Sequence, residues 1–136
     1  MLKSVISRIS EALADKGAQH IYSAFDNIPV AYKGKDIFNI VGIEGFESSV
    51  PIYSQYNVFI PFKADAAVSV AAPPDYPAEK LYSYFDEHVL PAFESISSLT
   101  CSLKKLVIKK DSSVNHLVLK ANFSVSGITR LERSSV

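Results

Sequence analysis

The sequence predicts an α+β fold: a mainly antiparallel sheet with two helices packed on one face and a closing β-hairpin at the C-terminus. Three observations predict it. Two segments carry apolar residues at helical spacing, the long segments between and after them have strand patterns, and the strands are grouped together. At 136 residues the chain is expected to form a single α+β domain, 1–136, with a hydrophobic core of its own.

The first helix is expected from Leu2 to Leu13, where apolar residues recur at helical spacing between polar ones. Gly17 is well placed to end this helix, because glycine readily takes the left-handed conformation that follows a last turn. A short strand is expected at residues 20–25, and a second brief extended piece at 30–32 after a turn.

The two long strands expected next, 37–46 and 52–62, have apolar side chains on both faces. In the first strand, one face holds Ile37, Val41 and Ile43, and the other holds Phe38, Ile40 and Phe46. Gly42 and Gly45 indicate a bulge or a close backbone approach inside it. Pro61 indicates that the second strand is an edge, a bulge or a boundary there.

The second helix follows residues 64–72, which are expected to be extended. It is expected to begin near Asp75 or Tyr76, with Pro77 tolerated in its first turn. Pro91 is expected to kink or split it near Leu90, because proline cannot donate the backbone hydrogen bond there. Its buried stripe is expected to comprise Leu81, Phe85, Val89 and Phe93.

The chain is expected to close with strands at 104–110 and 116–129. The last strand has the cleanest alternation in the sequence, which is typical of a half-exposed strand. The residues expected on its apolar face are Leu117, Leu119, Ala121, Phe123 and Val125.

A partner subunit is expected because two helices cover only one face of the sheet, while the middle strands are apolar on both. Exposed apolar surface costs about 25 cal/mol per Å², which favours association. We therefore predict a homo-oligomer, and the candidate interface residues are Phe38, Phe46, Tyr56 and Phe62. The alternative is that the sheet curls on itself or that loops fold over it.

The charge is balanced overall but unevenly distributed. From Asp65 to Glu94 there are six acidic residues against one lysine, and from Cys101 onward seven basic against two acidic residues. Such polarity would help copies dock head to tail, although a solvated surface explains it as well. A formal net charge of zero gives no argument for a nucleic-acid or membrane partner. Without a secretory signal or a bilayer-spanning run, the protein is expected in the cytoplasm.

No motif predicts catalysis, a cofactor or a metal. His20, His88 and His116 lack ligand spacing, and Cys101 stands alone in what reads as a strand entry. The four lysines near residues 104–110 fall on both sides of a strand, which divides the basic patch. The residues therefore name no activity by themselves. Two alternatives stay open: a small-molecule-binding or adaptor module with a pocket between sheet and helices, and an enzyme whose residues converge only in three dimensions. The pocket residues considered are Phe59, Tyr82 and Phe85.

The element order resembles that of the small tail-terminator or tail-completion proteins of long-tailed bacteriophages and prophages. The resemblance covers nearly the whole chain: a first helix, two long strands, a proline-flanked second helix at 77–93 and a closing hairpin. It implies a non-enzymatic structural subunit that forms rings by self-association and joins the tail tube to the connector on the head side. Its partners would be other phage tail or connector proteins, and its location the cytoplasm during assembly and then the virion tail. Pro91 departs from the group's pattern by interrupting the second helix.

Overall fold

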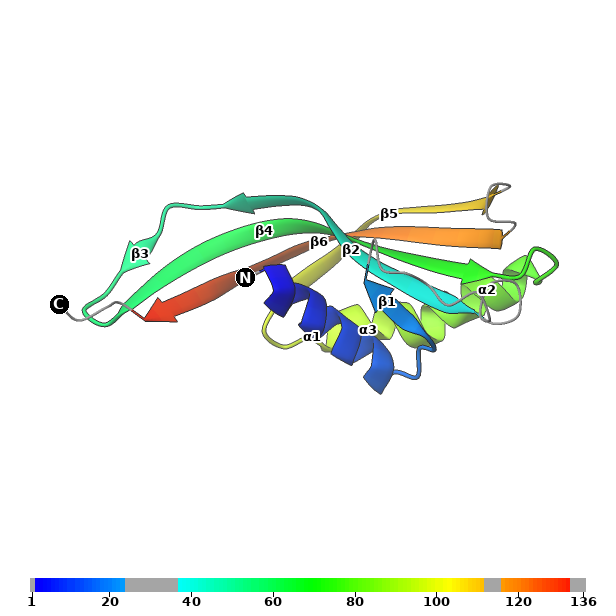
Figure 1. Ribbon diagram of the computed structural model, residues 1–136, viewed down its shortest axis with the longest axis horizontal. Helices are drawn as coiled ribbons and strands as arrows, with labels where there is room; N and C mark the ends of the chain where they lie inside the picture. The colour runs from blue at the N-terminus through cyan, green and yellow to red at the C-terminus, as the bar shows by residue number, and fades with distance from the viewer. Residues whose placement is uncertain (1, 24–36, 112–115, 133–136) are drawn as a thin grey trace.

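The computed structural model describes residues 2–23, 37–111 and 116–132. They form a six-stranded sheet with strand order β1-β2-β4-β6-β5, in which β3 also pairs with β4, and helices on one face of it (Figure 1). The predicted α+β class with a mainly antiparallel sheet is confirmed, and the sheet does not close on itself. The elements are α1 (Leu2–Asp15), β1 (Ile21–Ser23), β2 (Phe38–Ser48), β3 (Ile52–Tyr53), β4 (Asn57–Ala72), α2 (Ala78–Tyr84), η2 (Phe85–Val89), α3 (Leu90–Ser95), β5 (Thr100–Asp111) and β6 (His116–Glu132).

Helix α1 buries one apolar stripe against the sheet and ends as predicted at Gly17. Gly17 has a φ of 86°, in the left-handed region. The N–H of Ala18 donates to Leu13 O at 3.0 Å, and the N–H of Gly17 donates to Ala14 O at 3.0 Å. These two bonds satisfy carbonyls that the last helical turn leaves without a partner. The chain then enters β1, which pairs in parallel with β2 and confirms the short strand expected near residues 20–25. The extended piece expected at 30–32 lies outside the described residues.

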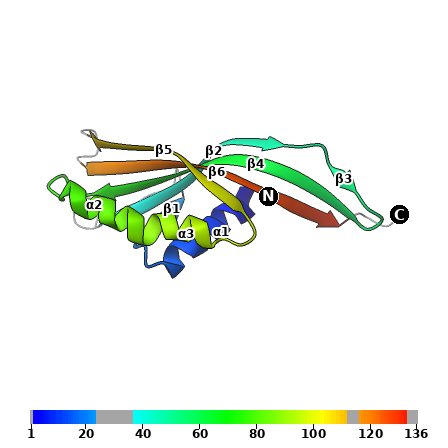
Figure 2. The same cartoon turned by 180° about the vertical axis from the view of Figure 1, so that it is seen from behind.

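The second helix is one rod made of α2, the π-turn η2 and α3 (Figure 2). Its start at Ala78 lies two to three residues beyond the predicted start at Asp75 or Tyr76, because Pro77 is still extended (φ −63°, ψ 131°). Pro91 has no N–H, so it cannot donate the usual helical hydrogen bond to the carbonyl of Glu87. The helix widens into a π-turn just before it, where the N–H of Leu90 donates to Phe85 O, five residues earlier. The predicted interruption near Leu90 therefore takes the form of a π-turn within a continuous rod.

The core lies between this rod, α1 and the sheet. Phe123 of β6 is buried at its centre, with its ring 3.7 Å from that of Phe93 at 5° and 6.5 Å from that of Phe85. The predicted alternation of the last strand is correct: Leu119, Ala121, Phe123 and Val125 are buried, and Leu117 is partly buried against the same core.

A β-bulge in β2 changes which aromatic side chains share a face. The register with β4 shifts between Ile43 and Gly45, so Glu44 is the extra residue. The predicted glycine-flanked bulge is therefore present, and it turns Phe46 to the helix-covered face, where its ring stacks on Phe62 at 5.5 Å. The expectation that Phe38 and Phe46 share a face is wrong, because strict alternation does not hold across a bulge.

The expected strand at 52–62 is divided. The N–H of Ser54 donates a hydrogen bond to Asn57 O at 2.9 Å in a turn that separates the short β3 from β4. β4 is a strand of 16 residues. β4 continues through Pro61. Pro61 lies between the part of β4 that pairs with β2, which ends at Phe62, and the part that pairs with β3, which begins at Phe59. Its carbonyl accepts a hydrogen bond from Ser49 N–H at 2.8 Å. Pro61 therefore lies at a local edge, where its missing N–H breaks no ladder bond.

Candidate assembly interface

The strands β4 and β6 extend well beyond the helices. In both views the helices cover only one half of the sheet, and β3 with the adjoining ends of β4 and β6 projects from it (Figures 1 and 2). We call residues 49–61 and 128–132 the arm. The body is the rest of the sheet with the helices packed on it, and the face of the sheet opposite the helices is the open face.

The arm concentrates the exposed apolar surface of the described residues. Its large exposed side chains make up six of the eleven found: Val50, Ile52, Tyr53, Tyr56, Ile128 and Leu131. Because the arm is a small part of the chain, such enrichment marks it as the surface with most to gain from contact with another protein.

Both faces of the arm are apolar. The register places Tyr53, Val58 and Leu131 in one row on the helix side. Ile52 and Phe59 pair on the other side, where Pro61 also lies opposite Ile128. Since no helix covers either face in the figures, the property predicted for the middle strands belongs to the arm.

The four candidate interface residues are not gathered on one surface. Phe38 and Phe62 are buried within the chain, at 5% and 4% exposure. Phe38 contacts the rings of Tyr22 and His116, with centroids 6.4 and 5.3 Å away. Phe46 is partly buried on Phe62. Tyr56, at the tip of the arm and 67% exposed, is the member placed where another chain can reach it.

The open face of the body is polar around Glu44. Glu44, which the bulge projects over this face, accepts hydrogen bonds from Asn122 Nδ2 at 2.7 Å and Lys120 Nζ at 3.2 Å. The Lys120 bond and then the Asn122 bond lower the pKa of Glu44, against a smaller opposing effect of burial. Around Glu44 the open face therefore carries polar and charged side chains, whereas Phe38, which pairs with Ala71 on the same face, is buried against Tyr22 and His116.

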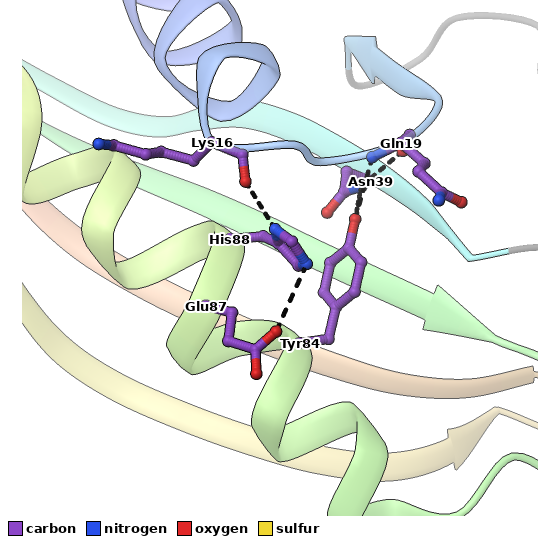
Figure 3. A network of polar contacts seen from close by, with 6 residues as sticks. All are labelled: Lys16, Gln19, Asn39, Tyr84, Glu87 and His88. Carbon is purple, nitrogen blue, oxygen red and sulfur yellow. Dashed lines mark hydrogen bonds and ion pairs between the residues drawn. The ribbon is translucent and has the colours of Figure 1, made fainter.

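A polar network ties α1, β2 and the second helix together (Figure 3). The fully buried Asn39 donates from Nδ2 to Tyr84 Oη at 2.9 Å and to Gln19 O at 2.7 Å, and Gln19 N–H donates to the same Tyr84 oxygen at 3.1 Å. His88 Nδ1 lies 2.6 Å from Lys16 O, so that nitrogen carries the proton and donates to the end of α1. Each bond joins separate elements, which makes the network a structural brace of the body.

The chemical candidates of the sequence are dispersed. No group of three metal-ligating side chains occurs among the described residues. Cys101 is half-buried, and desolvation raises the pKa of its thiol, which favours the unreactive protonated form. The suggested pocket is not formed by its three residues: Phe85 lies in the core, Tyr82 is exposed on α2 and Phe59 belongs to the arm. No helix in the described part of the chain is long and apolar enough to span a membrane.

Comparison with solved structures finds the sheath/tube terminator of an extracellular contractile injection system, PVC, in its extended state. The identity is 13% and the TM-score 0.52, and the match covers 100% of this chain but 59% of that one. This similarity shows a shared fold. The fimbrial biogenesis protein PilO of Pseudomonas aeruginosa also matches at 9% identity over 97% of this chain and 69% of its own, but a TM-score of 0.31 carries no argument. No protein-family model and no curated protein matches the sequence.

Proposed function

We propose that this protein is a non-enzymatic structural subunit of a phage or prophage tail, of the terminator or head–tail joining type, that acts by self-association. The fold it shares with a sheath/tube terminator supports the tail assignment. The likeness extends to 59% of that protein's length, so the role in a tail is inferred rather than transferred.

The observation that carries the proposal is the arm. It is a long ribbon with apolar side chains on both faces, and no helix of the described residues covers it. Such a projection supports contact with another protein chain, as expected of a subunit that reaches its neighbour. The partners it implies are further copies of this chain and other tail or connector proteins, met in the cytoplasm during assembly and kept in the finished tail.

Self-association is tested by sedimentation equilibrium over a range of protein concentrations. Wild-type protein is expected to form oligomers, and Tyr56→Ser at the tip of the arm is expected to weaken association about tenfold. Tyr82→Ser is the matched control, because Tyr82 is also exposed but lies on α2. A wild-type monomer at every concentration would contradict the proposal, as would equal effects of the two substitutions.

The place in the tail is tested in a strain that produces the particles. Removal of this protein is expected to leave heads and tails unjoined, and labelled protein is expected at the head-side end of the tail in electron micrographs. Complete, joined particles made in its absence would refute the tail role without bearing on self-association.

A further inference from the structure

The second helix turns a row of acidic side chains away from the sheet. Its exposed charged residues are four acids and one lysine: Glu79, Lys80, Asp86, Glu87 and Glu94. Glu79 and Asp86 are seven residues apart, which is about two helical turns, so they lie on the same side of the rod. That side is opposite the buried Leu81, which faces the sheet. Neither carboxylate forms an ion pair with another described residue.

The open face of β5 and β6 is basic. Lys105 and Lys109 lie exposed on this face of β5. Lys120 of β6 lies beside them, and the three lysines line a surface hollow. Glu44 already binds Lys120, whereas neither Lys105 nor Lys109 forms an ion pair with another described residue. The body therefore carries unpaired cations on the open face and unpaired carboxylates on the helix that covers the other face.

The second helix runs along the strands (Figure 2). Phe85 and Phe93 both contact the ring of Phe123, so the middle of the rod is level with this residue of β6. From there α2 extends toward the end of β4 (Figures 1 and 2). Asp86 therefore lies near the level of Phe123, and Glu79 lies about 10 Å further toward the end of β4.

The lysines follow the same order on the open face. Lys105 pairs with Asn122, next to Phe123 on β6, and Lys109 pairs with Val118, toward the end of β4. The two lysines are four residues apart, which is about 13 Å along β5. The open face thus presents cations at about the levels and the spacing at which the helix presents carboxylates.

We propose that copies of this chain stack in sequence, with the second helix of one copy covering the open face of β5 and β6 in the next. A neighbour stacked without a shift along the strands brings Asp86 toward Lys105 and Glu79 toward Lys109. The inference deepens the proposed function, on whose self-association it rests. Because the two surfaces differ, the contact repeats from copy to copy and either closes into a ring or continues as a filament.

The charges favour these two different surfaces over two identical ones. Two open faces in contact would bring lysines together, and two second helices would bring carboxylates together. The contact also gives the open face a helical layer, which no helix of the described residues provides (Figures 1 and 2). Tyr82 is about 100° around the helix from Leu81 and points to the flank of the rod, so it lies at the rim of this contact. Residues at a rim contribute little to binding, and Tyr82→Ser remains a control for the arm.

Charge reversal and mixing test the stacking by sedimentation velocity. Lys109→Glu alone and Glu79→Lys alone are each expected to weaken self-association about tenfold, because each places like charges across every junction. An equal mixture of the two variants is expected to regain assembly. In an alternating stack, the reversed open face of one variant meets the reversed helix of the other, and the next junction joins the two unchanged surfaces.

Lys110→Glu is the matched control. Lys110 is also exposed and follows Lys109 in β5, but it pairs with Leu117 on the helix side of the sheet, so its reversal is expected to leave assembly unchanged. Assembly of Lys109→Glu and Glu79→Lys at wild-type strength, a mixture that stays dissociated, or an equal loss in Lys110→Glu would overturn the stacking. Each of these results leaves the proposed function standing if the wild type assembles. A wild type that never associates would instead refute the self-association on which both depend.

Discussion

The body and the arm share two strands, β4 and β6, yet the same kind of side chain has a different fate in each. In the body, Val68 and Phe123 are buried by helices of the same chain. In the arm, Ile128 and Leu131 on the continuation of β6 are 58% and 50% exposed. Leu131 continues the helix-side row of Phe123 beyond the end of the helices, and Ile128 lies on the open face, which no helix of the described residues covers. An apolar sequence pattern predicts that a strand must be buried against something. Only the positions of the helices show whether the same chain buries it.

The sharpest contrast between the two regions is expected from truncating one apolar side chain in each. Phe123→Ala should lower the free energy of unfolding by about 3–5 kcal/mol, because it removes a ring stacked between helices and sheet. Ile128→Ala should change the stability of the monomer by less than about 0.5 kcal/mol and weaken self-association instead. Urea unfolding at low protein concentration measures the first quantity. A large loss of monomer stability in Ile128→Ala would mean that the chain itself covers the arm.

The boundary between body and arm offers a second contrast at two glycines. A Cβ at Gly127 would lie 2.8 Å from Leu99 Cδ2 and 3.1 Å from Phe62 Cζ, both in buried side chains. Gly127→Ala should therefore cost about 1–3 kcal/mol of unfolding free energy.

Gly45→Ala is the control, because its nearest neighbour at 3.0 Å is Asp65 Oδ2, at the end of a side chain that is free to turn. It should cost less than about 0.5 kcal/mol. Equal costs in thermal or urea unfolding would contradict the view that the sheet is tightly packed up to Gly127 and loose on its open face.

The polar network around Asn39 and Tyr84 should contribute to the stability of the body and have no effect on self-association through the arm. Tyr84→Phe removes the oxygen that accepts from Asn39 Nδ2 and Gln19 N–H, and should cost about 1–2 kcal/mol. Tyr82→Phe, on the exposed side of the same helix, should be neutral in the same urea titration. The self-association of Tyr84→Phe is expected to equal that of the wild type. If Tyr84→Phe leaves the free energy of unfolding unchanged, the polar network contributes no net stability.

The smallest expected effect is a pH dependence on the open face. The pKa of Glu44 is lower in the folded chain than in the unfolded one, so its carboxylate stabilises the fold above the unfolded pKa. That contribution is lost as pH falls through the folded pKa, from about pH 5 toward pH 3. It should be well below about 1 kcal/mol, since solvent screens an exposed pair. Glu44→Gln should remove this part of the acid dependence of the urea midpoint, and identical pH profiles would contradict it.

The sequence predicted the helices and the last strand well, because their patterns are regular, Gly17 marks the end of the first helix and Pro91 marks the interruption of the second. Phe46 was placed on the wrong face since a bulge shifts alternation by one residue, and glycines indicate a bulge without giving its position. The burial of Phe38 and Phe62 within the chain does not follow from the sequence pattern, because their cover comes from segments remote in sequence, such as His116 of β6 beside Phe38. The arm was hidden for a similar reason: a pattern of apolar residues does not tell how far a strand extends past its helices. The turn at Ser54–Asn57, with its polar residues, was the available signal for the tip.

Pro61 has a consequence for how far the arm can recruit strands from other chains. It sits in the gap between the end of β2 and the start of β3, and its carbonyl is already engaged by Ser49. A foreign strand that tried to fill this gap would find one acceptor occupied and no donor beside it. Pro61 therefore blocks strand addition at this position of β4, while residues 127–132 of β6 keep an edge with no paired strand among the described residues, which leaves the other side of the arm as the place where a foreign strand could add.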